Sequence, residues 1–292
     1  FTMRFVGTPF TFAYEQVGNN CGLLGKNAAV EVDGAAYWMS DNGFFRYTGQ
    51  LQSMQCLVED YVYDDLNTSS NQLVYCGINN LFGEITWFYC TSGSNVVDRS
   101  VTYSYLDSTR DRPIWFTNAS SIFPRTTWED SSVFGLPHAT QYDADTDTCG
   151  TVGNTDGISI YYEHETGVNY IKGGTSFAVP ASITSGDYDI TQDQREGISF
   201  RGDGEFIMRV SRIIPDFITQ TGNAIVQLDL RDYPNDAATS SPLGPFTLTP
   251  TTTKVDTRAR ARQIALTISN TAVDSNWKLG TFRLDVHSGG RR

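Results

Sequence analysis

The sequence contains few of the patterns that helical, membrane-spanning or zinc-binding proteins need. Helical periodicity is scarce along its 292 residues, and no apolar run approaches the roughly 18 residues of a membrane helix. There are only three histidines, His138, His164 and His287, and none pairs with another at a spacing that builds a zinc site. We therefore expect no membrane span and no zinc centre.

The cysteines are too scattered to act in pairs. They are Cys21, Cys56, Cys76, Cys90 and Cys149, an odd number. None lies two or three residues from another, which excludes zinc ribbons and redox motifs of the Cys-x-x-Cys type. We expect buried free thiols, as in a protein made in a reducing cytoplasm.

Basic residues are also few. Lys and Arg number 21 against 33 Asp and Glu, a net charge of −12. Residues 254–292 hold eight of the basic and three of the acidic residues, which gives +5 and leaves −17 on the rest of the chain. Such an acidic body argues against a surface that grips nucleic acid, because phosphate binding requires basic residues. Two interpretations of the basic tail stay open: contact with an acidic partner, such as a neighbouring copy, and a solvated strand with charged edges.

Aromatic residues are abundant, and apolar and polar residues alternate with the period of a β-strand. The chain contains 17 Phe, 15 Tyr and 5 Trp, which favour strands. Turn pairs at Asp33-Gly34, Asn42-Gly43 and Thr48-Gly49 separate four short predicted strands. These strands cover residues 29–32, 36–39, 44–47 and 51–54. A four-stranded meander of this kind is the blade of a β-propeller.

A second unit of the same kind follows, with predicted strands at 73–76, 85–89, 99–105 and 114–116. Trp38 and Trp87 occupy equivalent second-strand positions, about 49 residues apart, which lies in the range of a blade repeat. A third unit is predicted at 132–172, and residues 58–66 are predicted to form a short helix or turn. Residue 1 falls inside a predicted strand, so we expect that the chain is part of a longer one.

The pattern changes near residue 181, where the predicted strands become longer. They cover residues 188–190, 206–210, 224–228, 246–248, 264–268 and 281–286. This spacing is typical of a β-sandwich. The predicted fold class is therefore all-β, with propeller-like four-stranded meander blades at 1–180 and a β-sandwich-like domain at 181–292.

Three arginines stand out in the last part of the chain. Arg258, Arg260 and Arg262 share a face with Ile264, Leu266 and Ile268 if residues 258–268 form one strand. The arginine half of that face would lie in solvent or against an acidic surface, and the apolar half would lie in a core. We predict an assembly contact at the three arginines, with an exposed strand end as the alternative.

One motif suggests catalysis without the residues that catalysis needs. Residues 174–180, Gly-Thr-Ser-Phe-Ala-Val-Pro, resemble the serine motif of subtilisin-like proteases. Here His138 is followed by Ala139 instead of the family's Gly-Thr, and the aspartate motif is absent upstream. A serine without a base is a weak nucleophile, so we predict that Ser176 lies in a turn between strands.

Acidic pairs and repeats allow other interpretations. Asp143, Asp145 and Asp147 alternate as in a calcium loop, but the sixth and twelfth positions are Thr148 and Asn154 rather than Gly and Glu. A structural calcium and a solvated loop both stay open. The pairs at 59–60 and 64–65 resemble acid/base pairs for sugar hydrolysis, yet no aromatic subsite accompanies them. We predict no enzyme activity, no cofactor and no catalytic residue.

Several segments together resemble one family. They are residues 22–26 with 37–47, residues 56–67, residues 75–89 and residues 245–292. The chain is similar along most of its length to tail nozzle (tail tubular) proteins of short-tailed bacteriophages, which are virion structural proteins. The resemblance implies a propeller-containing protomer in a homo-oligomer, usually a hexamer, around the tail axis.

The family's position in the virion implies partners and a localisation. The ring would adjoin the tail adaptor protein and the tail fibre or tip proteins, and it would be made in the bacterial host cytoplasm. Double-stranded DNA would pass through it during genome ejection without specific binding, because an acidic wall repels the duplex. Three blades cannot close a ring, so further blades upstream or a reduced version of the fold is implied. The alternative function is a carbohydrate-binding β-propeller for receptor recognition.

Overall fold

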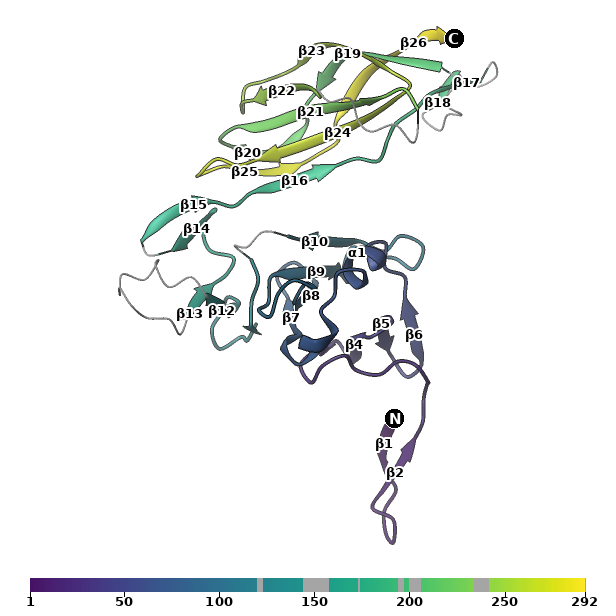
Figure 1. Ribbon diagram of the computed structural model, residues 1–292, viewed down its shortest axis with the longest axis vertical. Coiled ribbons are helices and arrows are strands. Elements are labelled where there is room, and N and C mark those ends of the chain that lie inside the picture. Colours follow the sequence, from purple (N-terminus) through teal and green to yellow (C-terminus); the bar gives the residue numbers. More distant parts are fainter. Residues whose placement is uncertain are drawn as a thin grey trace. The chain divides into compact units, whose positions relative to one another are not determined.

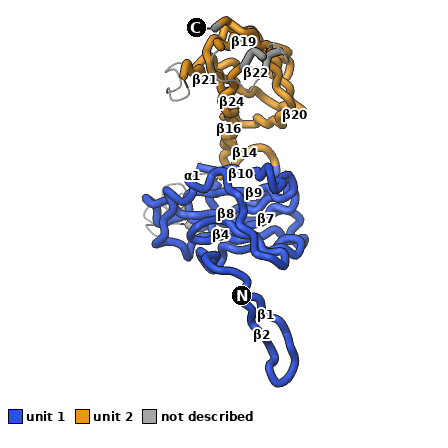
Figure 2. The backbone as a smooth tube through the Cα atoms, turned by 90° about the vertical axis from the view of Figure 1, so that its right-hand side faces the viewer, with its two compact units in different colours: residues 1–166 blue, residues 167–292 orange. Residues whose placement is uncertain are grey.

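The computed structural model describes residues 1–119, 123–143, 158–172, 174–193, 197–199, 206–233 and 242–291. Strand makes up 54% of the chain and helix 4%, which confirms the predicted all-β class. The chain divides into two compact units, Phe1–Thr166 and Gly167–Arg292 (Figure 2). The predicted boundary at 180/181 falls inside the second unit, between strands β15 (Thr175–Ala178) and β16 (Ala181–Thr184). None of the described helices is long and apolar enough to span a bilayer.

Unit 1 contains both predicted four-stranded meanders (Figure 1). The first consists of β3 (Ala29–Val32), β4 (Ala35–Ser40), β5 (Gly43–Tyr47) and β6 (Leu51–Met54). The second consists of β7 (Tyr75–Asn79), β8 (Glu84–Tyr89), β9 (Arg99–Ser104) and β10 (Trp115–Asn118). In the first hairpin Asp33 and Gly34 have φ of 52° and 78°, the turn geometry that Asp-Gly favours. A propeller arrangement of these sheets stays a prediction.

Aromatic side chains join the two meanders into one core. The ring of Phe44 lies 5.0 Å from that of Trp87 and 4.8 Å from that of Trp115. Trp87 is fully buried, and its Nε1 donates to the carbonyl of Ala28 at 3.0 Å. Trp38 has the equivalent strand position but is only half-buried, stacked on Phe45 at 5.8 Å. The two tryptophans therefore do not have equivalent roles in packing.

A short helix and a smaller sheet complete unit 1. Helix α1 (Glu59–Tyr63) and the 3-10 helix η1 (Thr68–Leu73) connect the two meanders, and Val62 anchors α1 in the core. The predicted third unit, 132–172, includes β12 (His138–Asp143) and β13 (Ile158–Glu163), which form a three-stranded sheet with the preceding β11 (Thr127–Glu129) among the described residues. The unit begins with a hairpin of β1 (Thr2–Phe5) and β2 (Phe12–Glu15).

Unit 2 is a sandwich of two main sheets (Figure 1). One sheet has the order β16-β24-β21-β22, with β24 (Gln263–Asn270), β21 (Ala224–Arg231) and β22 (Leu243–Leu248). The other has the order β23-β19-β26, with β23 (Val255–Ala261), β19 (Phe206–Ile214) and β26 (Arg283–Arg291). Buried residues from both sheets, such as Met208, Val210, Leu228 and Ile264, form one core.

Smaller two-stranded sheets accompany this sandwich. They pair β14 (Asn169–Lys172) with β15, β17 (Thr191–Asp193) with β18 (Gly197–Ser199), and β20 (Phe217–Thr221) with β25 (Asn276–Leu279). The predicted strand at 188–190 contributes only an isolated bridge between Tyr188 and Ile264.

The single strand predicted over residues 258–268 is wrong. The chain leaves β23 at Ala261, passes Arg262 and enters β24, which belongs to the opposite sheet. The crossing changes which positions face the core. Thr257, Ala259 and Ala261 are buried in β23, whereas in β24 the fully buried side chains include Ile264 and Ile268. The alternation of buried and exposed positions in β23 therefore does not continue into β24.

Candidate interaction surfaces

The β1–β2 hairpin has one apolar face that is exposed to solvent. Its register places Met3 opposite Tyr14 and Phe5 opposite Phe12, so the four side chains share a face. Their exposed fractions are 60%, 69%, 70% and 48% in that order. We call this set, Met3, Phe5, Phe12 and Tyr14, the apolar hairpin face. No further strand of the described chain pairs with β1 or β2.

The polar side chains of this hairpin lie on its opposite face. The register pairs Thr2 with Glu15 and Arg4 with Ala13. Sequence reasoning placed a strand at the start of the chain but did not identify the apolar face. The signal was the alternation of Phe1, Met3 and Phe5, which is mirrored in the second strand.

The outer face of the β23-β19-β26 sheet carries a row of basic side chains, three arginines and one histidine. Arg209 in β19 lies opposite Arg260 on one side and opposite His287 on the other. Arg258 lies two residues before Arg260 in β23, and all four side chains are exposed. We call these residues, Arg209, Arg258, Arg260 and His287, the cationic face. Within the described part of the chain, none of these four side chains has a hydrogen bond or ion pair.

The neighbouring row on this sheet is neutralised. Arg212 lies 2.9 Å from Asp256 and 3.4 Å from Asp285, and Lys254 lies 3.0 Å from Asp256. The hydrogen bond from Arg212 lowers the pKa of Asp256 below its ordinary value. The two aspartates therefore neutralise Arg212 and Lys254, whereas Arg283 of β26 is a further exposed cation without an ion pair among the described residues.

Only two of the three predicted assembly arginines lie on this face. Arg258 and Arg260 point outward from β23. Arg262 lies at the crossing between the sheets, where its guanidinium carbon is 5.8 Å from the centre of the Tyr233 ring. Sequence reasoning did not identify Arg209 or His287, because strands distant in the chain bring them beside Arg260.

A surface of the opposite charge lies around α1. Leu57, Asp60, Tyr61 and Asp64 follow the spacing of one face of a helix and are all exposed, and we call them the α1 surface. Leu57 and Tyr61 are 67% and 49% exposed. The carboxylates of Asp60 and Asp64 are four residues apart, a spacing at which like charges repel each other.

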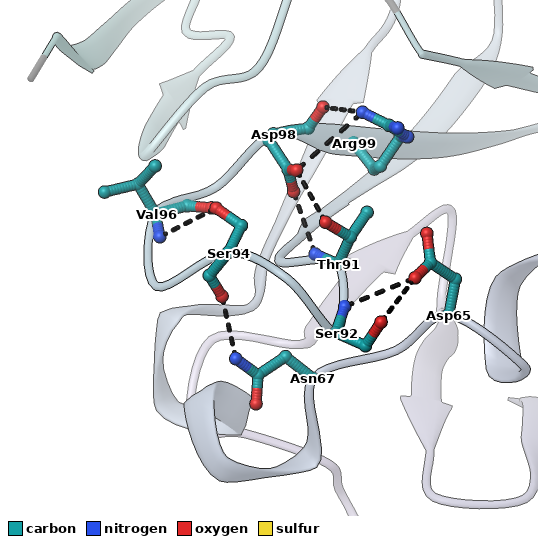
Figure 3. A network of polar contacts seen from close by, with 8 residues as sticks. All are labelled: Asp65, Asn67, Thr91, Ser92, Ser94, Val96, Asp98 and Arg99. Carbon is teal, nitrogen blue, oxygen red and sulfur yellow. Dashed lines mark hydrogen bonds and ion pairs between the residues drawn. The ribbon is translucent and has the colours of Figure 1, made fainter.

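Asp65, which follows Asp64 in the acidic pair at 64–65, has a structural role (Figure 3). Its carboxylate accepts a hydrogen bond from the hydroxyl of Ser92 at 2.7 Å, and Asn67 Nδ2 donates to the carbonyl of Ser94 at 2.7 Å. Asp98 accepts bonds from the backbone N–H and the hydroxyl of Thr91. The contacts of Asp65 and Asn67 fasten the β8–β9 loop to the segment that follows α1, and those of Asp98 close the loop on itself.

Unit 1 also contains a cleft of about 640 Å³ between β5–β6 and the β9–β10 connection. Its polar lining includes Arg46, Gln52, Tyr105 and Arg110, and no carboxylate of the described residues lines it. The ring of Tyr103, which also lines the cleft, lies 4.8 Å from that of Trp115. The exposed large apolar residues of the described chain include none of its five tryptophans, all of which lie in described ranges.

The histidine between two glutamates, His164, is held in a buried cluster. Its Nε2 accepts a hydrogen bond at 2.8 Å from Nε of Arg125, which is 2% exposed. The Arg125 guanidinium lies 4.3 Å from the centre of the Tyr162 ring, and the Trp128 ring lies 4.5 Å from that of His164. Burial, followed by the charge of Arg125, lowers the pKa of His164 to about 3. This imidazole is a neutral hydrogen-bond acceptor in the fold.

The remaining motifs are the segment around Ser176 and the aspartate repeat at 143–147. Ser176 lies in β15, a strand rather than the predicted turn, and its exposed side chain has no hydrogen bond within the described chain. Asp145 and Asp147 lie outside the described residues, as does the side chain of Asp143, which ends β12. No group of three or more His, Cys, Asp or Glu that could hold a metal occurs in the described ranges.

The described cysteines are free thiols, as predicted. Cys56, Cys76 and Cys90 are buried, Cys21 is half-buried, and Cys149 lies outside the described residues. Burial raises the pKa of Cys90 to about 11 and that of Cys56 to about 12. These two thiols are therefore protonated, unreactive members of the core at neutral pH.

No protein-family model matches the chain, and no curated protein matches it.

Proposed function

We propose that this chain is a structural subunit that assembles with copies of itself, of the kind that forms the tail nozzle of a short-tailed bacteriophage. The observation that carries the proposal is the apolar hairpin face. A two-stranded hairpin is marginally stable in water, and a contiguous exposed apolar patch marks an interaction site. The hairpin is therefore an element built to be covered by a partner.

The size of this surface is adequate for assembly. The hairpin carries five aromatic side chains, Phe1, Phe5, Phe10, Phe12 and Tyr14, whose exposed fractions run from 48% to 82%. Such side chains bury about 150–250 Å² each, so together they offer roughly 500–900 Å². A stable interface buries about 800 Å² per partner, and its core is rich in Phe and Tyr.

The charge of the chain supports a conduit for DNA. Unit 1 holds seven Lys and Arg against twenty Asp and Glu, a net charge of −13. A wall with this charge would repel the phosphate backbone and let the duplex slide. The phage context comes from the resemblance of the segments at 22–26 with 37–47, 56–67, 75–89 and 245–292 to tail nozzle proteins.

The alternative, a carbohydrate-binding propeller, has less support. Sugar recognition by stacking needs an exposed aromatic ring beside polar groups, and the two aromatic residues that line the cleft, Tyr103 and Tyr105, are half-buried. The cleft has amide, hydroxyl and guanidinium groups, but its Tyr103 ring packs on Trp115. No specific observation therefore favours this function.

The proposal is tested on the hairpin. We expect the purified chain to form rings in negative-stain electron microscopy and F5S/Y14S to associate on the order of 100-fold more weakly, because two aromatic side chains would no longer be buried. The matched control, T2S/A13S, changes the opposite face of the same hairpin and should assemble normally. A wild-type chain that stays monomeric at high concentration and is absent from virion tails would count against the proposal.

A further inference from the structure

The cationic face is under electrostatic strain in the isolated subunit. Arg209 lies directly opposite Arg260, and like charges opposite each other destabilise a sheet. No carboxylate of the described chain forms an ion pair with either side chain, although Arg212 in the next row holds two. Guanidinium groups form strong, geometrically defined pairs with carboxylates. A partner that brings carboxylates to this face would therefore relieve the repulsion.

The α1 surface has the complementary property. Asp60 and Asp64 repel each other across one turn, and Tyr61 and Leu57 beside them are exposed. An arginine can pair with a carboxylate here and stack on the tyrosine ring at the same time. The surface thus offers charge, an aromatic ring and apolar area together.

The net charges of the two units differ in the same direction as these two surfaces. Unit 2 holds fourteen Lys and Arg against thirteen Asp and Glu, a net charge of +1, whereas unit 1 carries −13. Each copy therefore has a more negative and a more positive unit. Copies that join through unlike surfaces make a heterologous contact, which closes into a ring when the rotation between copies permits it.

We propose that the cationic face of one copy docks on the α1 surface of a second copy. This inference rests on the proposed self-assembly and names the contact that sets the direction of the ring. It is separate from the apolar hairpin face, which supplies area without charge. The two contacts together would give affinity through the hairpin and orientation through the charges.

Nucleic acid is the other polyanion that such a face could bind. The charge of the whole chain, −12, opposes the approach of a duplex. Asp256 and Asp285 border the cationic face and would meet the phosphates. A duplex brings a continuous row of phosphates, whereas the α1 surface of a second copy brings two carboxylates, which match the two opposed guanidinium groups of Arg209 and Arg260.

The test reverses the charges on each side of the contact. R209E/R260E should associate roughly tenfold or more weakly than the wild type in sedimentation velocity, since two like-charged surfaces would meet. D60K/D64K should lose association for the same reason. A mixture of the two variants should recover it, because the reversed face of one then meets the reversed α1 surface of the other. Recovery in the mixture shows that the contact joins different copies.

A matched control separates this effect from net charge. K26E/K278E makes the same change in charge as R209E/R260E at exposed positions outside both surfaces, and we expect normal association. All the altered side chains are exposed, so circular dichroism and the melting temperature should be unchanged, because R209E/R260E replaces one like-charged opposed pair by another.

The outcomes distinguish this inference from the proposed function. A monomeric wild type overturns both. A wild type that assembles, with R209E/R260E and D60K/D64K assembling equally well, overturns the docking contact and leaves self-assembly standing. Recovery only when all four changes are in one chain would place the contact between units of the same molecule and overturn the inference. Salt-dependent binding of duplex DNA that R209E/R260E abolishes would assign the face to nucleic acid instead.

Discussion

His164 contributes to stability only while its ring is neutral. A proton on Nε2 would remove the acceptor of the Arg125 hydrogen bond and place a second cation beside the guanidinium. The pKa of this ring is lowered from its ordinary 6.5 to about 3, so the unfolded state binds the proton more tightly. The contribution is therefore complete above about pH 6.5 and is lost as the pH falls toward 3.

We expect His164→Gln to remove this pH dependence. The glutamine amide oxygen can still accept the bond from Arg125, and it does not titrate in this range. In urea titrations, the free energy of unfolding of the wild type should fall by about 2–3 kcal/mol more than that of the variant between pH 7 and pH 4.5. Parallel falls in the two proteins would show that the ring does not lose its proton on folding.

At the scale of the element, Asn67 links a helix to a distant loop. Its Oδ1 accepts a hydrogen bond from the backbone N–H of Ser69 at 3.0 Å, which caps η1, and its Nδ2 donates to Ser94 in the β8–β9 loop (Figure 3). A cap contributes about 1 kcal/mol and an internal hydrogen bond about the same. One side chain thus supports two elements.

Asn67→Ala should lower the free energy of unfolding by about 1–2 kcal/mol. Asn67→Asp keeps the acceptor for Ser69 and loses the donor to Ser94, so its cost isolates the second bond. Unfolding of the three proteins in guanidinium chloride measures the cost of losing each of the two hydrogen bonds. Equal stability of the wild type and Asn67→Ala would mean that the loop is held by the Asp65 and Asp98 contacts alone.

The elements themselves were largely predictable. The two meanders of unit 1 follow from short alternating strands with turn pairs, because a hairpin needs only contacts near in the chain. The error at 258–268 has the opposite cause. The chain alternates through β23 and β24 without a Gly or Pro between them, so only the strand pairing, β23 with β19 and β24 with β16 and β21, reveals that it crosses from one sheet to the other.

At the scale of the whole molecule, each unit has its own core. The unit 2 core is built from residues of the sandwich strands, and the main unit 1 core from the meanders and α1. A unit with a complete core of its own can fold without the rest of the chain. Division at 166/167 keeps the β14–β15 hairpin with the sandwich.

We expect a fragment of residues 167–292 to fold by itself. It should show the circular dichroism of a β-protein and one cooperative thermal transition, since the sandwich core is intact. The same fragment with Leu228→Ala should unfold at a clearly lower temperature, because a fully buried leucine costs about 2–5 kcal/mol when truncated. A gradual transition without a midpoint would show that unit 1 is required for folding.

The sequence by itself determined the fold class, the two meanders, the acidic balance of the chain and the absence of a base beside Ser176 along the chain. All of these depend on local alternation, turn chemistry or composition, which neighbouring residues carry. Only the tertiary structure decided that Arg209 and His287 join Arg260, that Arg262 leaves that face, and that His164 is a buried acceptor. These facts depend on which strands pair across distant parts of the chain, and strand pairing is set by the burial of whole faces rather than by any short stretch of sequence.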